Sequence, residues 1–163
     1  MLQRFLLSIF MLLFIAACGS TPKEESAASG AGELTSVDYT SDGIKAGSAD
    51  DLIVNVGDRV FFEFASHELT SDAQDHLQAV AAWLKQYSNV NIIVEGHCDE
   101  RGTREYNIAL GERRAQAMKN YLIGLGIEAG RLSTISYGKE RPAVLGSSES
   151  AWAQNRRAVA AVN

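Results

Sequence analysis

The sequence changes character near residue 51, and this change limits where a folded core can form. Half of residues 19–50 are Ser, Gly or Ala, with no apolar periodicity. Such a stretch buries too little apolar surface to offset its ordering entropy, so we expect a flexible linker over residues 18–50. A core must then form within residues 51–163, about 110 residues, which is enough for one ordinary domain. A small extra strand over residues 34–39 is the alternative for the end of the linker.

The composition fits a globular domain and argues against several classes of protein. Hydrophobic residues make up 46% of the chain and charged residues 21%, which excludes collagen-like, coiled-coil and fully disordered chains. The formal net charge is −5 and there is no basic stripe, so we expect no nucleic-acid partner. Two cysteines cannot supply a disulfide-rich scaffold or a four-cysteine zinc site. We expect no metal and no other cofactor.

An apolar run occupies the N-terminus. Met1–Arg4 carries one positive charge and Phe5–Ala17 is apolar except for Ser8, which predicts a secretory signal peptide over residues 1–17. A helix that spans a bilayer needs about 20 apolar residues, so a transmembrane anchor is the less favoured alternative. The run ends in Ile15-Ala16-Ala17-Cys18, which resembles a bacterial lipobox and implies lipid attachment to Cys18. An ordinary signal peptide that happens to contain this cysteine is the other alternative.

Acylation of Cys18 would tether the mature chain to a bilayer without spanning it. The next residue is Gly19, and by resemblance to the sorting rule for such lipoproteins a residue other than aspartate implies the outer membrane. The domain would then face the periplasm. Lipid attachment would also consume Cys18, which leaves Cys98 without an internal disulfide partner.

Strand and helix patterns alternate after residue 51. This alternation implies crossover connections, so we predict an α/β fold (an α+β sandwich) in which helices pack on a mixed β-sheet. The apolar stripe expected on the second helix consists of Leu110, Ala117, Tyr121 and Leu125. Residues 52–56 and 60–64 predict one or two strands, and further strands are predicted over residues 91–95, 132–137 and 156–162. The predicted helices cover residues 71–87, 104–122 and 150–154.

The densest cluster of polar residues follows the third predicted strand, over residues 95–103. Loops at the carboxyl ends of strands are where α/β sheets bind ligands. In the helix that follows, Asn107, Leu110 and Arg114 share one face, which can look back over the loop that carries Asp99. A carboxylate and a guanidinium across one pocket suit a zwitterion, with its ammonium at Asp99 and its carboxylate at Arg114. A structural ion pair between these two residues is the alternative.

Four segments together resemble one known domain family. They are residues 96–103, 105–115, 136–146 and 155–159. In this order they resemble the OmpA C-terminal-like domain family, and the resemblance covers roughly residues 51–163. It implies a domain that binds peptidoglycan non-covalently at the meso-diaminopimelate of the stem peptide, whose side chain ends in a free amino acid headgroup.

The resemblance also implies roles for individual residues. Asp99 would take the ammonium of diaminopimelate and Arg114 its carboxylate. The sequence departs from the family pattern at Ala65, where aspartate is frequent, and at Cys98, where a small residue or threonine is usual. Further ligand contacts are implied for Arg101, Leu110, Asn107, Phe64 and Ala65.

The residues of the polar cluster give little support for catalysis. His97 and Cys98 are adjacent near the end of a strand, so their side chains point to opposite sides and cannot easily form a nucleophile–base pair. His97, Cys98 and Asp99 also lack a recognisable metal-ligand spacing. We therefore expect that the protein is not an enzyme.

The resemblance, together with the lipobox, implies a role in the cell envelope. An outer-membrane lipoprotein of this kind would tether the outer membrane to the cell wall as part of the Tol system, with effects on envelope integrity and cell division. The alternative is a protein-interaction module whose main role is to dock a periplasmic Tol β-propeller. Its partners would then be peptidoglycan, the outer-membrane lipid through Cys18, and the Tol β-propeller.

Overall fold

The computed structural model of the chain describes residues 38–40 and 43–163. The predicted signal peptide, Cys18 and most of the predicted linker lie outside these residues. In the described part of the linker, Tyr39 and Lys45 form an isolated antiparallel bridge. None of the helices in the described ranges is long and apolar enough to cross a membrane.

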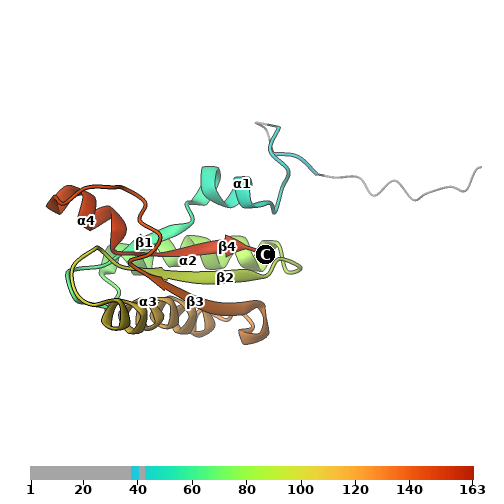
Figure 1. Cartoon of the computed structure of the whole chain (residues 1–163). Coiled ribbons are helices and arrows are strands. Elements are labelled where there is room, and N and C mark those ends of the chain that lie inside the picture. Colours follow the sequence, from blue (N-terminus) through green and yellow to red (C-terminus); the bar gives the residue numbers. More distant parts are fainter. Residues whose placement is uncertain (1–37, 41–42) are drawn as a thin grey trace, which may run out of the picture. The chain divides into compact units, whose positions relative to one another are not determined.

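A four-stranded mixed sheet forms the centre of the domain (Figure 1). Its strands are β1 (Arg59–Phe61), β2 (Ile92–His97), β3 (Leu132–Gly138) and β4 (Arg157–Val162), in the order β1-β4-β2-β3. The β2–β3 pair is parallel, whereas β4 is antiparallel to both β1 and β2. The parallel pair needs a crossover connection, and the long helix between the two strands supplies it. The predicted mixed sheet is confirmed.

Two long helices cover the sheet, and both begin at a threonine cap. In α2 (Ser71–Gln86) the Thr70 hydroxyl accepts from the Ala73 N–H, and in α3 (Arg104–Gly124) the Thr103 hydroxyl accepts from the Tyr106 N–H. Such caps satisfy backbone donors that the first turn leaves unpaired. The short helix α4 (Glu149–Asn155) precedes β4.

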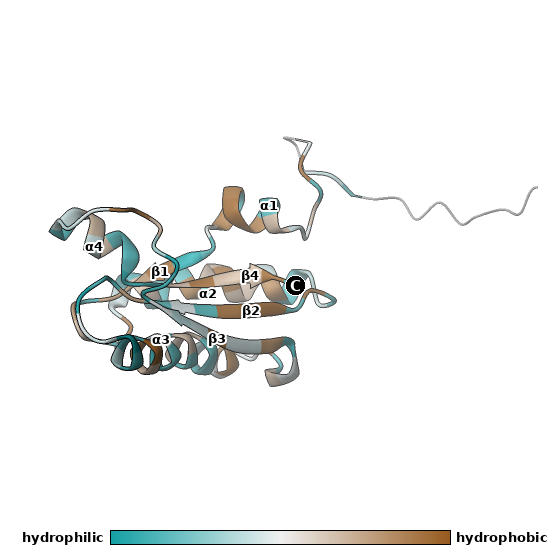
Figure 2. Ribbon diagram, viewed as in Figure 1, coloured by the Kyte–Doolittle hydropathy of each residue, from teal (hydrophilic) through white to brown (hydrophobic). Residues whose placement is uncertain are grey.

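One apolar core lies between the sheet and the two long helices. Alternate residues of the strands point into it because side chains in a strand change face at every residue. Figure 2 shows apolar colours at the start of β2, but hydrophilic colours at its end and in the loop that leads to α3. The sheet contributes Val60, Ile92, Val94, Ala158 and Ala160, and the helices contribute Leu77, Val80, Leu84, Ala115, Met118 and Leu122.

The strand predicted over residues 52–56 is wrong, because these residues are helical. The helix α1 (Ala49–Asp51) continues directly into a π-helical turn over Leu52–Val56, called η1. The buried carboxylate of Asp51 accepts hydrogen bonds from the Trp83 indole at 3.0 Å and from the Asn55 amide at 2.7 Å. The local bond to Asn55 and the tertiary bond to Trp83 fix the helical conformation and outweigh the β preference of the β-branched residues.

The apolar stripe predicted for α3 is partly correct. Leu110 is buried, and Tyr121 and Leu125 are half-buried and pack against the core, although Leu125 lies just beyond the end of the helix. Ala117 is half-buried. The face that turns inward includes polar residues in its first half, and the spacing of apolar residues does not reveal that these polar residues are buried. The buried residues of α3 are Asn107, Leu110, Gly111, Arg114, Ala115, Met118 and Leu122.

Helix α3 crosses β2 at close range through two glycines. A side chain at Gly96 would collide with the backbone carbonyl of Gly111, and one at Gly111 would collide with the Ser136 hydroxyl. The absence of side chains lets the two backbones touch. This contact holds the start of α3 directly against the end of β2, where the polar loop begins.

Candidate functional site

A pocket forms between the first half of α3, the loop that follows β2 and the loop that follows β1. We call it the α3 pocket. All seven residues predicted to contact a ligand line it, and the structure adds Cys98 and Tyr106 to them. The ligand roles of these residues stay predictions. The lining residues are Phe64, Ala65, Cys98, Asp99, Arg101, Tyr106, Asn107, Leu110 and Arg114.

Arg114 is completely buried, and backbone carbonyls hold its guanidinium in place. Its Nε donates to the Ser66 carbonyl at 2.8 Å, Nη1 to the His97 carbonyl at 2.7 Å, and Nη2 to the Glu63 carbonyl at 3.2 Å. Burial lowers the pKa of Arg114, but a guanidinium remains charged in proteins. A guanidinium has five N–H groups in a fixed fork, so the three carbonyls leave two donors for another acceptor.

Asp99 is the buried acid of the pocket, with 4% of its surface exposed. Its carboxylate accepts from the Arg101 backbone N–H at 3.1 Å and from the Arg101 guanidinium at 2.6 Å. A second guanidinium, that of Arg156, lies 3.5 Å away. Burial acts to raise the pKa of Asp99, but the hydrogen bonds from Arg101 outweigh it and hold the pKa below its ordinary value. The carboxylate is therefore charged at neutral pH.

The two opposite charges of the pocket do not neutralise each other. Within residues 38–40 and 43–163, the ion pairs of Asp99 are with Arg101 and Arg156, and none joins it to Arg114. The alternative of a structural ion pair between Asp99 and Arg114 is therefore wrong. Both groups line the same pocket, which places a buried anion and a buried cation at one small cavity.

Arg101 lines the α3 pocket, and its side chain is partly exposed. Its guanidinium lies between the rings of Phe64 and Trp152, 4.0 Å from each ring centre, which are favourable cation–π distances. The Trp152 indole also donates to the Glu100 carboxylate at 3.0 Å. The resulting cavity is only about 10 Å³, which is about the space of one water molecule.

Two residues near the pocket have roles that the sequence alone did not reveal. Arg156 is buried and donates from Nε to the Phe62 carbonyl at 3.0 Å, while its Nη2 lies 2.8 Å from Glu149. It therefore joins the loop after β1, helix α4 and Asp99. Arg156 lies within the last of the four motifs, which is the only signal that could have found it. No such signal marks Trp152 as a partner of Arg101.

The remaining lining residues shape the pocket and its loop. The buried amide of Asn107 donates to the Arg101 carbonyl at 2.9 Å and so fixes the loop that carries Asp99. Leu110 forms a buried apolar wall. Ala65 has a φ of 54°, a left-handed conformation that is uncommon for residues other than glycine.

Cys98 and His97 have properties that do not suit nucleophilic catalysis. Burial raises the pKa of Cys98 to about 11, so its thiol is protonated at neutral pH, and it donates to the Asn107 carbonyl at 3.4 Å. Only the thiolate is a good nucleophile. Burial and the nearby charge of Arg157 lower the pKa of His97 to about 4, so this imidazole is neutral.

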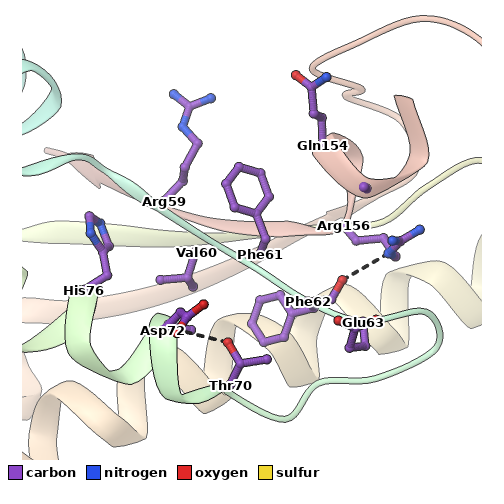
Figure 3. A pocket seen from close by; sticks show the side chains of 12 residues that line it. Arg59, Val60, Phe61, Phe62, Glu63, Thr70, Asp72, His76, Gln154 and Arg156 are labelled. Carbon is purple, nitrogen blue, oxygen red and sulfur yellow. Dashed lines mark hydrogen bonds between the residues drawn. The ribbon is translucent and has the colours of Figure 1, made fainter. Parts of the chain in front are cut away.

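A larger groove lies beside β1 and has no lining residue in common with the α3 pocket (Figure 3). Its volume is about 720 Å³, and β1, the start of α2 and the end of α4 line it. Figure 3 shows Phe61 and Phe62 on opposite sides of β1, with Arg156 bonded to the Phe62 carbonyl. The charge of Arg59 is already paired with Asp58 at 2.6 Å. We therefore place the candidate site in the smaller α3 pocket, where a buried carboxylate and a buried guanidinium that do not pair with each other line one cavity.

Comparisons with known proteins agree with this fold. Residues 61–156 match the OmpA family. A peptidoglycan-associated lipoprotein of Mesorhizobium japonicum is 47% identical, over 94% of this chain and 88% of that protein. One from Brucella melitensis is 43% identical, over 96% of this chain and 90% of that protein.

Solved structures show the same fold. One of them is the crystal structure of the peptidoglycan-associated lipoprotein from Burkholderia pseudomallei. The match covers 65% of this chain and 90% of that chain, with 42% identity and a TM-score of 0.63. Another is the C-terminal domain of Helicobacter pylori MotB. This match covers 65% of this chain and 84% of that chain, with 25% identity and a TM-score of 0.61. The chain therefore belongs to the OmpA family.

Proposed function

We propose that the protein is an outer-membrane lipoprotein that binds peptidoglycan non-covalently in the α3 pocket, at the diaminopimelate of the stem peptide. The names of its relatives support peptidoglycan as the polymer that this protein binds, since those proteins are peptidoglycan-associated lipoproteins. The observation that carries the proposal is the pair of buried, opposite charges, Asp99 and Arg114, that line one pocket without pairing with each other.

The chemistry of the ligand matches these charges. The side chain of diaminopimelate ends in an ammonium and a carboxylate on one carbon atom. Asp99 would receive the ammonium, and the two N–H groups of Arg114 that the carbonyls leave free would receive the carboxylate as a charge-assisted pair. The apolar wall at Leu110 would pack against the methylene chain of the ligand. Arg101, Asn107, Phe64 and Ala65 would border the site.

Binding of this kind requires no covalent step, so we propose that the protein is not an enzyme. The protonated thiol of Cys98 and the neutral imidazole of His97 are consistent with such a role. Specificity would come from the fixed distance between the two charged groups. A ligand that carries only one of the two charges would leave the other protein charge buried and unpaired, which is costly.

The proposal includes the anchor. A lipid at Cys18 would hold the protein in the outer membrane, residues 18–50 would act as a linker, and the domain over residues 51–163 would reach the wall from the periplasmic side. A linker of this length spans about 30 Å as a random coil. The linker therefore raises the effective concentration of the domain at the wall, so that many weak contacts can hold membrane and wall together. Such a link would serve the Tol–Pal system, envelope integrity and cell division.

A second candidate function is to dock the periplasmic Tol β-propeller. The observation that favours it is a pair of exposed aromatic side chains at the pocket, Phe64 with 59% and Tyr106 with 45% of their surface exposed. Exposed aromatic residues are common anchors of protein interfaces. A propeller bound over these residues would cover the α3 pocket, so wall and propeller would compete.

The test is a pull-down of purified sacculi with the mature chain. We expect Asp99→Asn and Arg114→Lys to reduce the bound fraction at least tenfold, because each leaves one pole of the ligand without a matched partner. Free diaminopimelate should displace the wild-type chain. Arg104→Gln is the matched control, because Arg104 is exposed, lies outside the pocket and pairs with Glu140. Wild-type levels of sacculus binding by both pocket variants would falsify the proposal.

A further inference from the structure

Arg101 occupies the position at Asp99 that the proposed ligand needs. The Nη2 atom of Arg101 lies 2.6 Å from the Asp99 carboxylate, which is the shortest ion-pair distance of that acid. The side chain of Asp99 is only 5% exposed, and the cavity in front of it has room for about one water molecule. An ammonium group cannot reach Asp99 while Arg101 stays in this place.

The contacts of Arg101 are strong on its faces and incomplete at its edge. Phe64 and Trp152 hold the flat guanidinium from both sides, at 4.0 Å each. Its Nε, however, is buried and has no hydrogen-bond partner among the described residues. A buried donor without a partner is unfavourable, so this arrangement holds Arg101 less firmly than the three carbonyls hold Arg114.

Arg101 also has another position available to it. Its Nη1 lies 3.8 Å from the carboxylate of Glu149 on α4, which is 66% exposed. With 30% of the Arg101 side chain exposed, the guanidinium can move outward toward Glu149 and solvent without losing every acidic partner. Asp99 would keep the guanidinium of Arg156 at 3.5 Å.

From these contacts we propose that Arg101 is an internal competitor for the ammonium subsite of the α3 pocket. In the ligand-free protein its guanidinium pairs with Asp99, and a ligand binds by exchange, replacing this guanidinium with its own ammonium. The inference rests on the proposed function, because it assumes that Asp99 receives an ammonium group.

The exchange explains how a buried carboxylate can serve as a binding group. A buried charge without a partner is costly, and Arg101 supplies a partner whenever the ligand is absent. It also makes α4 sensitive to ligand, since Trp152 loses its stacked cation when Arg101 leaves. Arg101 therefore regulates the affinity of the pocket, in addition to bordering it.

The test is a titration of free meso-diaminopimelate into the mature chain, for the wild type, Arg101→Gln and Arg104→Gln. Removal of the competitor should tighten binding by Arg101→Gln about three- to tenfold, the range expected from a partly exposed ion pair. Arg104→Gln removes an equal charge three residues away and should leave the affinity unchanged. The thermal unfolding of each variant verifies that it is folded.

Trp152 fluorescence supplies a second measurement. The emission of the wild type should change on saturation with diaminopimelate, whereas Trp152→Phe should show no such change. Arg101→Gln should bind the ligand without this change, because the stacked cation is already gone.

The outcomes separate this inference from the proposed function. Binding by the wild type, with an unchanged or weaker affinity for Arg101→Gln, overturns the inference alone, and so does an undiminished fluorescence change in that variant. No binding by the wild type overturns the proposed function and the inference with it.

Discussion

The two halves of α3 bury side chains of different chemistry. In the first half, Asn107 and Arg114 are 1% and 0% exposed, and in the second half Met118 and Leu122 are both 0% exposed. The apolar half packs into the core and stabilises the fold. The polar half needs backbone carbonyls to offset the cost of burying it. Burial alone therefore does not distinguish a structural face from a functional one, whereas the hydrogen-bond partners do.

The comparison predicts that the apolar half governs stability and leaves binding intact. Leu122→Ala should lower the free energy of unfolding by about 2–5 kcal/mol, because it leaves a cavity between α3 and the sheet. Urea unfolding followed by circular dichroism gives this value. The folded fraction should still bind diaminopimelate with wild-type affinity. A specific loss of affinity without a loss of stability would contradict the division of α3 into two halves.

A second prediction concerns His97, the last residue of β2, and the pH dependence of stability. The carbonyl of His97 accepts from Arg114, and its side chain has a pKa lowered to about 4. Its unfolded pKa is about 6.5, so the unfolded chain binds a proton first as the pH falls. Stability should therefore be greatest above pH 6.5 and fall by roughly 2–3 kcal/mol toward pH 4.

The measurement is the free energy of unfolding at several pH values for the wild type and for His97→Gln. The variant should lose most of the slope between pH 6.5 and pH 4, although its stability at pH 7 is also lower. If the wild type and the variant have the same slope in that interval, His97 is not the group responsible.

Loss of the Asp99 charge should reduce ligand binding more than it reduces stability. Asp99→Asn should weaken binding of diaminopimelate by about 2 kcal/mol or more, because the ammonium loses its charged partner. Its effect on stability should be smaller than that of Leu122→Ala, since Arg156 also keeps its contact with Glu149. Calorimetry measures the first quantity and urea unfolding the second.

The lowered pKa of Asp99 also leads us to expect a loss of stability at acid pH. Its folded pKa lies below the ordinary value, so its contribution is fully present above about pH 4 and is lost as the pH falls through the folded pKa. The stability difference between wild type and Asp99→Asn should thus be constant from pH 7 to pH 5 and shrink below pH 4. A difference that grows in acid would contradict a lowered pKa.

The smallest effect is expected at the exposed first residue of α3, which lines neither the core nor the α3 pocket. Arg104 pairs with Glu140 at 3.2 Å, but 70% of its side chain is exposed. Exposed ion pairs contribute about 0–1 kcal/mol, so Arg104→Gln should change stability by less than about 0.5 kcal/mol and binding not at all. The same titration and unfolding experiments verify this. A large effect on binding would extend the site beyond the α3 pocket.

Much of the fold could be predicted because its elements have regular patterns. Both long helices and the mixed sheet follow from the spacing of apolar residues and from the alternation of strands with helices. The helical segment Leu52–Val56 could not be predicted in this way. Its conformation depends on the bond between Asp51 and Trp83, residues that are far apart in the chain.

In the candidate site, too, local spacing could be predicted from the sequence, whereas contacts between distant segments could not. The helix period places Asn107, Leu110 and Arg114 on one face, and the structure confirms that they share the pocket. The contacts of Asp99 with Arg156 and of Arg101 with Trp152 join segments more than fifty residues apart, so local spacing does not show them. The ligand roles of the pocket residues remain predictions.

The central claim is that the two buried charges of the pocket bind the two poles of one headgroup. The most direct test is calorimetric titration of the mature chain with two stem peptides that differ only at the third residue, diaminopimelate or lysine. Lysine keeps the ammonium but lacks the carboxylate that Arg114 would bind. We predict that the diaminopimelate peptide binds at least about 30-fold more tightly, equivalent to about 2 kcal/mol. Equal affinities for the two peptides would contradict the claim.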